Sequence, residues 1–181
     1  MHGQSPLAMT DEAPTDEPDC LQDIILENDA WRIAPFLQDE AKTAVNEALK
    51  AALAEAKLPQ NTALTVLLAD DAALQRLNAD HREQDKPTNV LSFPAVGPGE
   101  TPIDGHYGDI AIALETVLSE AREAQVSPAN HLAHMVVHGV LHLAGYDHNQ
   151  DDEAEIMEAM EVRALERIGI PDPYADSELA F

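Results

Sequence analysis

The sequence predicts a single compact α+β domain in which about four short strands are combined with about five helices. Its 181 residues suffice for one domain with a substantial core but not for two. Four short segments are apolar and rich in β-branched residues, as strands are. Five other segments are expected to be helices, and the clearest of them repeats apolar residues at a spacing of three and four, which is typical of amphipathic helices.

The first half of the domain contains two strands and two helices by these criteria. Residues 21–27 and the short apolar run 63–69 have the length and composition of strands. Between them, residues 35–57 follow the amphipathic helical pattern most clearly. An aspartate after the second strand caps a short helix, which we expect to end near Asn78.

The second half adds a hairpin and three helices. Strands at 88–93 and 107–114 flank a loop rich in Gly and Pro and would pair with each other. The middle helix of the three has a hydroxyl N-cap, Ser127, followed by Pro128 at its first position. The three helices are expected at 115–125, from 128 onwards, and at 151–168.

The two ends of the chain differ in composition from this domain. Residues 1–20 are rich in Asp, Glu, Pro and Thr, and burial of their few large apolar side chains would not offset the entropy lost on ordering. We therefore expect a disordered acidic tail over 1–20, a domain over 21–171 and a short C-terminal tail over 172–181.

The charge and the cysteine content restrict the partners and the compartment. With 34 acidic and 10 basic residues the formal charge is -24, which argues against tight nonspecific binding to a polyanion. The single Cys20 cannot form an internal disulfide, which fits a reducing cytoplasm. No secretory leader and no membrane-spanning run is expected.

Three histidines, His138, His142 and His148, follow one another at offsets of four and six. On a helix the first two lie one turn apart on the same face. Gly145 would end that helix and reverse the chain, which would return His148 toward the other two rings. Three imidazoles with a fourth position left for water are the pattern of catalytic zinc, so we predict one zinc ion per chain on these ligands.

Two more histidines, His131 and His134, project from the same face of that helix, and apolar side chains fill the opposite face. We expect them to be exposed or to contact the ligands, not to bind the metal themselves. Gly139 lies where helix-based zinc peptidases of the same histidine spacing carry a glutamate as general base. Glycine cannot hold a proton, so hydrolysis is expected, and peptides are the less favoured substrate.

The segment 77–94 combines a helix end, a turn and a strand, and it contains Arg82 and Lys86, two of the ten basic residues. Arg82 is either a solvated loop charge or a guanidinium that binds a phosphate in fork geometry. The sequence alone does not place it near the metal.

Together, the segments 77–94, 108–110 and 138–148 resemble, in content and order, the motifs of the YbeY family of bacterial endoribonucleases and rRNA maturation factors. The resemblance covers roughly residues 21–170. It implies a compact α+β domain with a small mixed four-stranded sheet, zinc on the three histidines, and metal-dependent cleavage of single-stranded RNA. It also implies 16S rRNA 3′-end maturation, ribosome quality control, and the small ribosomal subunit and its assembly proteins as partners.

The resemblance also suggests roles for individual residues. Arg82 matches the family's functional arginine, so Arg82 and His138 are the candidate catalytic residues, and Arg82 and Lys86 are candidates for binding the substrate phosphate. His81 stands where an aromatic residue is common, and Asn89 where aspartate is common. Asp109 would orient a ligand histidine, assist with protons or merely end a strand; the sequence does not choose among these.

Two other functions remain open at this stage. One is a zinc hydrolase of another substrate, including peptides, and the other is a non-catalytic ribosome-assembly factor with structural zinc. The charge of -24 requires an RNA-binding surface to come from a local patch. Lysines 42, 50 and 57 on the long helix would extend such a patch, or they form only its solvated face.

Overall fold

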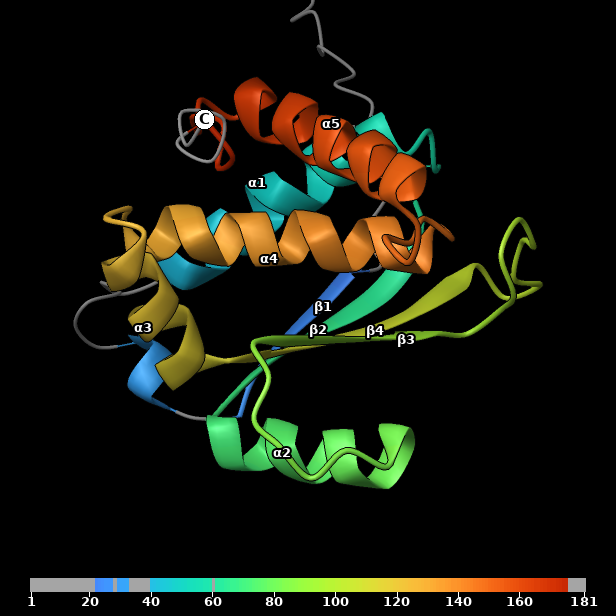
Figure 1. Cartoon of the computed structure of the whole chain (residues 1–181). Helices are drawn as coiled ribbons and strands as arrows, with labels where there is room; N and C mark the ends of the chain where they lie inside the picture. The colour runs from blue at the N-terminus through green and yellow to red at the C-terminus, as the bar shows by residue number, and fades with distance from the viewer. Residues whose placement is uncertain (1–21, 28, 33–39, 60, 176–181) are drawn as a thin grey trace, which may run out of the picture.

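The computed structural model describes residues 22–27, 29–32, 40–59 and 61–175, and within them it contains four strands and five α-helices, as predicted (Figure 1). The strands are β1 (Gln22–Leu26), β2 (Ala63–Ala69), β3 (Val90–Pro94) and β4 (His106–Ala113). The helices are α1 (Glu40–Glu55), α2 (Asp71–Arg82), α3 (Leu114–Glu123), α4 (Pro128–Leu143) and α5 (Asp151–Arg167). A short 3₁₀ helix, Asp29–Arg32, was not predicted.

The four strands form one mixed sheet in the order β1-β2-β4-β3. β1 pairs with β2 in parallel, and β2 pairs with β4 in parallel. β3 pairs with β4 antiparallel, which confirms the predicted hairpin. Helices α1 and α4 cover one face of the sheet and α5 packs over them, while α2 lies on the other face (Figure 1). The α+β class with a small mixed sheet is therefore confirmed.

Helix α4 lies at the centre of the main core. Its apolar face is fully buried against the sheet, α1 and α5, whereas its histidine face remains partly open. On the far side of the core, Trp31 of the 3₁₀ helix is 1% exposed and donates a hydrogen bond from its indole N–H to the carbonyl of Ala69, 2.9 Å away. The side chains on the open face of α4 therefore project from a helix whose other face is packed in the core.

The boundary of α2 differs from the prediction. The helix continues to Arg82 instead of ending near Asn78, and Glu83, at a φ of 57°, closes it with a backbone hydrogen bond to the carbonyl of Asn78. The buried Asn78 side chain donates to the carbonyl of Lys86, 2.9 Å away, and so fastens the following loop instead of ending the helix. The extra turn carries Arg82 along the outer edge of β3.

Parts of several predictions lie outside the described residues, namely the acidic tail 1–20, residues 35–39 of the first long helix and residues 176–181. Of the predicted C-terminal tail, residues 172–175 are described. None of the helices in the described ranges is long and apolar enough to cross a membrane.

Candidate metal centre

The end of α4 brings the three histidines together as the sequence predicted. Gly145 adopts a φ of +91°, and the backbone N–H of Tyr146 bonds back to the carbonyl of Leu141 at 3.0 Å. This left-handed turn reverses the chain. The His148 ring then lies 5.4 Å from that of His138 and 5.1 Å from that of His142, measured between centroids.

The nitrogens of the three rings converge. One ring nitrogen from each of His138, His142 and His148 lies within 4.8 Å of the other two, and the Nε2 atoms of His138 and His142 are 3.0 Å apart. Two zinc–imidazole bonds of about 2.0–2.1 Å at a tetrahedral angle would separate their nitrogens by roughly 3.3 Å. The spacing is therefore close to that which a bound ion requires.

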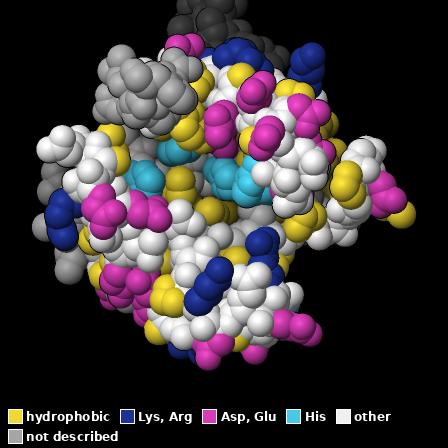
Figure 2. Space-filling model, in the orientation of Figure 1, with side chains coloured by type: hydrophobic (Ala, Val, Ile, Leu, Met, Phe, Trp, Pro, Cys, Tyr) yellow, Lys and Arg dark blue, Asp and Glu magenta, His cyan; other side chains and the backbone are white. Residues whose placement is uncertain are grey.

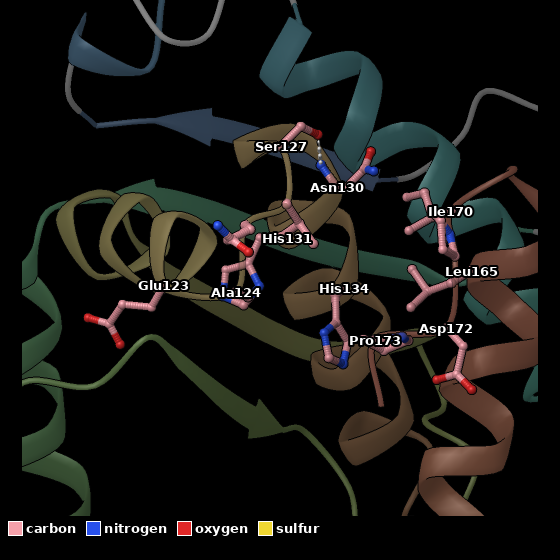
Figure 3. A pocket seen from close by; sticks show the side chains of 13 residues that line it. Glu123, Ala124, Ser127, Asn130, His131, His134, Leu165, Ile170, Asp172 and Pro173 are labelled. Carbon is pink, nitrogen blue, oxygen red and sulfur yellow. Dashed lines mark hydrogen bonds between the residues drawn. The ribbon is translucent and has the colours of Figure 1, made fainter. Parts of the chain in front are cut away.

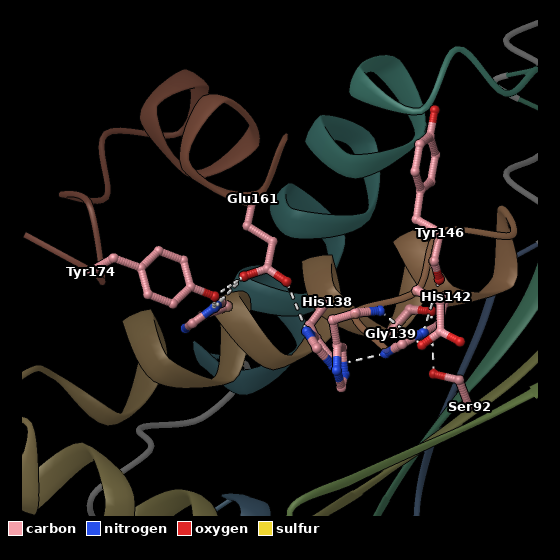
Figure 4. A network of polar contacts seen from close by, with 10 residues as sticks. Ser92, His138, Gly139, His142, Tyr146, Glu161 and Tyr174 are labelled. Carbon is pink, nitrogen blue, oxygen red and sulfur yellow. Dashed lines mark hydrogen bonds and ion pairs between the residues drawn. The ribbon is translucent and has the colours of Figure 1, made fainter. Parts of the chain in front are cut away.

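The other ring nitrogens fix the tautomers of the two helical histidines (Figure 4). His138 Nδ1 lies 2.7 Å from a carboxylate oxygen of Glu161, and His142 Nδ1 lies 3.0 Å from the carbonyl of Tyr146. Both partners accept hydrogen bonds, so each Nδ1 carries the proton and each Nε2 presents its lone pair to the centre. Burial, reinforced by the neighbouring imidazoles, lowers the pKa of His142 to about 4, so this ring is neutral at pH 7.

A metal ion fits these residues by the chemistry of the donors. Three imidazoles without a cysteine suit zinc and other divalent transition metals, and they leave a coordination position for water or substrate. The three side chains that converge are those that the sequence singled out as candidate ligands.

A buried carboxylate, Glu161 of α5, supports the cluster from behind. Its side chain is 1% exposed, and it accepts hydrogen bonds from His138, from His134 at 2.8 Å and from the hydroxyl of Tyr174. Burial raises the pKa of Glu161, but the two histidines outweigh burial and hold it at about 2. Burial and the Glu161 charge raise the pKa of Tyr174, which therefore stays protonated and donates. His134 thus contacts His138, one of the candidate ligands, through Glu161.

Arg82 and the three histidines line one pocket of about 210 Å³. The guanidinium of Arg82 lies against β3, and its Nη2 donates a hydrogen bond to the backbone carbonyl of Ser92 at 3.3 Å. Arg82, whose position relative to the histidines the sequence left open, therefore lies in the same pocket as they do. Lys86 is exposed in the loop after α2 and is not among the residues that line the pocket, and lysines 42, 50 and 57 are not among them either.

Gly139 faces the sheet, not the metal pocket. A Cβ at this position would lie 2.9 Å from a side-chain carbon of Ile110 on β4, and the Gly139 carbonyl accepts a hydrogen bond from Ser92 at 3.2 Å. The position has no room for a glutamate, so the general base of the peptidases has no counterpart here.

Asp109, which the sequence left without a role, pairs with His106 at 3.2 Å on the surface, and its side chain is 56% exposed. It is not among the residues that line the metal pocket. His81 packs edge-on against Phe93, with ring centroids 5.1 Å apart. Its imidazole therefore makes the kind of ring contact that an aromatic residue at this position would make.

Sequence reasoning missed several residues around the site. Thr88 and Asn89 line the metal pocket, and the Asn89 amide donates to both oxygens of Glu120 at 3.1 and 3.0 Å. Glu120 also accepts from His131 Nε2 at 2.7 Å. One signal could have revealed Glu161, since it falls within the apolar stripe of α5, where a carboxylate is out of place.

Comparison with known proteins identifies relatives along most of the chain. The family model described as Endoribonuclease YbeY matches residues 26–169. A protein of Azorhizobium caulinodans named Endoribonuclease YbeY is 48% identical over 155 residues, which cover 84% of this chain and 95% of the relative. One of Maricaulis maris with the same name is 45% identical over 158 residues and covers 86% and 92%, respectively.

A solved structure agrees with the fold. The solution structure of a Thermotoga maritima protein superposes with a TM-score of 0.56 and covers 87% of this chain and 92% of its own. The two sequences are 24% identical, so the likeness concerns the architecture alone.

Proposed function

This chain belongs to the YbeY family of endoribonucleases, and on that premise we propose that its histidine pocket binds zinc and cleaves single-stranded RNA there. The protein is an endoribonuclease of rRNA processing, a hydrolase that acts on RNA. The observation that carries the proposal is the position of Arg82 in one pocket with three imidazoles whose lone pairs converge.

His138, His142 and His148 would hold the ion through their ring nitrogens. A bound zinc ion supplies Lewis acidity, which polarises a phosphoryl oxygen and lowers the pKa of a water molecule. Glu161 keeps the proton on His138 Nδ1, and the Tyr146 carbonyl does the same for His142, so both rings remain oriented toward the centre.

Arg82 is the residue that we assign to the scissile phosphate. Its guanidinium offers parallel N–H donors that match two phosphate oxygens, and its charge opposes the negative charge that builds up in the transition state. Lys86, in the loop after α2, would bind the backbone further along the strand as a point charge. Pairing with a complementary strand would bury the base edges and stiffen the backbone, so an unpaired strand suits a pocket this small.

The peptidase alternative loses support because Gly139 packs on Ile110, where no carboxylate fits.

The RNA that we assign as the substrate is 16S rRNA, cleaved at its 3′ end. We assign ribosome quality control in the cytoplasm as a further role. A chain of charge -24 gains little from general attraction to RNA. The small ribosomal subunit or its assembly proteins would therefore present the substrate.

Cleavage of a single-stranded RNA and of its duplex, with zinc content measured for every variant, tests the proposal. The wild-type protein should cut the single strand preferentially. His142→Ala should lose both zinc and activity. Arg82→Ala should keep its zinc and lose about 10²-fold or more in kcat/KM, as when a donor to a developing negative charge is removed.

Arg76→Ala is the matched control, because Arg76 is an exposed arginine on the same helix and does not line the pocket. It should cleave like the wild type. Full activity of Arg82→Ala on RNA would refute the phosphate assignment, and an active, zinc-free His142→Ala protein would refute the metal assignment. A protein that associates with ribosomal subunits but cuts no RNA would favour the non-catalytic assembly role.

A further inference from the structure

A second cavity, of about 700 Å³, is lined by the N-terminal half of α4 (Figure 3). Its floor carries Asn130, His131 and His134, with Glu123 on the α3 side and Asp172 on the α5 side. In the surface view, histidine side chains lie along a hollow that crosses this face of the molecule (Figure 2). The volume is within the range of small-ligand sites.

Hydrogen bonds connect this cavity to the metal centre at two points. His134 lines the cavity and shares the carboxylate of Glu161 with the ligand His138. His131 lines the cavity and shares Glu120 with Asn89 of the metal pocket. His134 and His138 are one helical turn apart, about 6 Å at 1.5 Å per residue, so one ligand can span both pockets.

The chemistry of the lining suits a base better than a phosphate. No lysine or arginine is among the described residues of the lining, while Glu123 and Asp172 add negative charge that would repel a phosphate. The imidazole of His131 lines the cavity with the 12% of its side chain that is exposed, where a base can contact the ring, and the amide of Asn130 can pair with a base edge. The carboxylates would accept hydrogen bonds from exocyclic amino groups.

We infer that this cavity is a subsite for one unpaired nucleobase of the substrate RNA, next to the phosphate that Arg82 binds. The inference rests on the proposed function, and it adds the way in which the strand is held. The phosphate lies at the cationic end of the hollow, and the neighbouring base turns into the acidic, imidazole-lined end. A duplex could not turn a base out in this way without losing a pair, so the subsite also selects single strands.

A combined scan of RNA and protein tests the subsite. A short unstructured RNA with one cleavage site is compared with versions that carry an abasic residue at successive positions around that site. For the wild-type protein, one abasic position next to the cleaved bond should raise KM about tenfold, because the contact between the base and the His131 ring is lost. His131→Ala should raise KM for the intact RNA about as much. In this variant the abasic RNA should have the same KM as the intact RNA.

His131→Phe separates stacking from the hydrogen bond to Glu120, because it keeps a ring face but loses the ring nitrogens. It should recover most of the affinity at unchanged zinc content. His106→Ala, a histidine on β4 outside both pockets, serves as the control and should leave KM unchanged.

Abasic residues that raise KM by the same factor in wild type and His131→Ala would overturn the subsite, even though the wild type cuts the intact RNA. A KM of His131→Phe for the intact RNA that is as high as that of His131→Ala would also overturn the subsite. Failure of the wild type to cut any of these RNAs would instead refute the proposed function.

Discussion

Among single residues, Glu161 shows how the fold orients the histidines that we propose as metal ligands. It is an acidic side chain at an interior position of α5, almost without exposure, and its oxygens meet His134 and His138 at 2.8 and 2.7 Å. A buried carboxylate would be costly without these donors. The arrangement orients the ring of His138 and increases the basicity of its Nε2 atom.

Glu161→Gln should therefore weaken zinc binding by about 10–100-fold, because the amide cannot accept from both imidazoles as the carboxylate does. The measurement is competition for zinc with a chromophoric chelator, which does not depend on cleavage. Glu158→Gln, an exposed position on the same helix, is the control and should bind zinc as the wild type does. An unchanged affinity of Glu161→Gln would show that Glu161 only packs.

A second prediction at this scale concerns Gly139. In Gly139→Ala the new methyl group would approach the buried Ile110 side chain to 2.9 Å, and overpacking of this kind costs about 1–3 kcal/mol. Alanine also has the higher helix propensity, which stabilises the folded state by up to about 1 kcal/mol relative to glycine. Urea unfolding should show a net loss of stability of about 1 kcal/mol, given these opposing effects. In the alanine background, Ile110→Ala should cost less than it does in the wild type, and equal costs would contradict the clash.

At the scale of elements, α4 shows what the sequence can and cannot predict. Its start at Ser127, its apolar face and the left-handed Gly145 follow from local capping, periodicity and turn chemistry, and all three are confirmed. The partners of its histidine face could not be predicted, because Glu161 and Tyr174 arrive from α5 and the segment after it through tertiary packing. Arg82 reaches the pocket only because α2 runs one turn further than its sequence pattern indicated.

The contact between α1 and α5 gives a prediction about pH. Glu55 of α1 pairs with Arg163 at 2.7 Å and with Arg167 at 3.1 Å. Burial raises the pKa of Glu55, but the hydrogen bonds and charges of the two arginines outweigh burial and leave it below its ordinary value of 4.5. A lowered pKa in the folded state means stabilisation that is complete above the unfolded pKa and lost as the pH falls through the folded one.

Glu55→Gln should therefore be less stable than the wild type at pH 7 by about 0.5–1 kcal/mol, a modest value because both arginines are about half exposed. The difference should narrow once the pH falls below 4.5. Denaturant unfolding at a series of pH values measures it. Glu166→Gln, at an exposed position on α5, should show no such pattern. A constant difference across the series would exclude the ion pairs as its source.

For the whole molecule, the main question is how a chain of charge -24 holds RNA. The surface view answers in part, since acidic side chains gather beside the histidine hollow on the α5 side, whereas basic side chains border the hollow on the α2 side, where acidic ones lie further out (Figure 2). Acidic residues at 151–153 and 155 on α5 are exposed. An RNA backbone would therefore follow the α2 side and avoid α5, which restricts both its path and its orientation.

This division of charge predicts a weak dependence of RNA binding on salt. Binding of single strands weakens with a slope of about -0.7 in log K against log salt for each phosphate neutralised, so two cations, Arg82 and Lys86, give about -1.4. Salt also screens the repulsion from the remaining acidic surface, which makes the slope shallower still. Fluorescence anisotropy of a labelled RNA in the His142→Ala background, which should bind without cutting, measures the slope. Arg82→Ala should reduce it by about 0.7. A slope of about -4 or steeper would correspond to about six phosphates and would require a cationic surface far larger than this face provides.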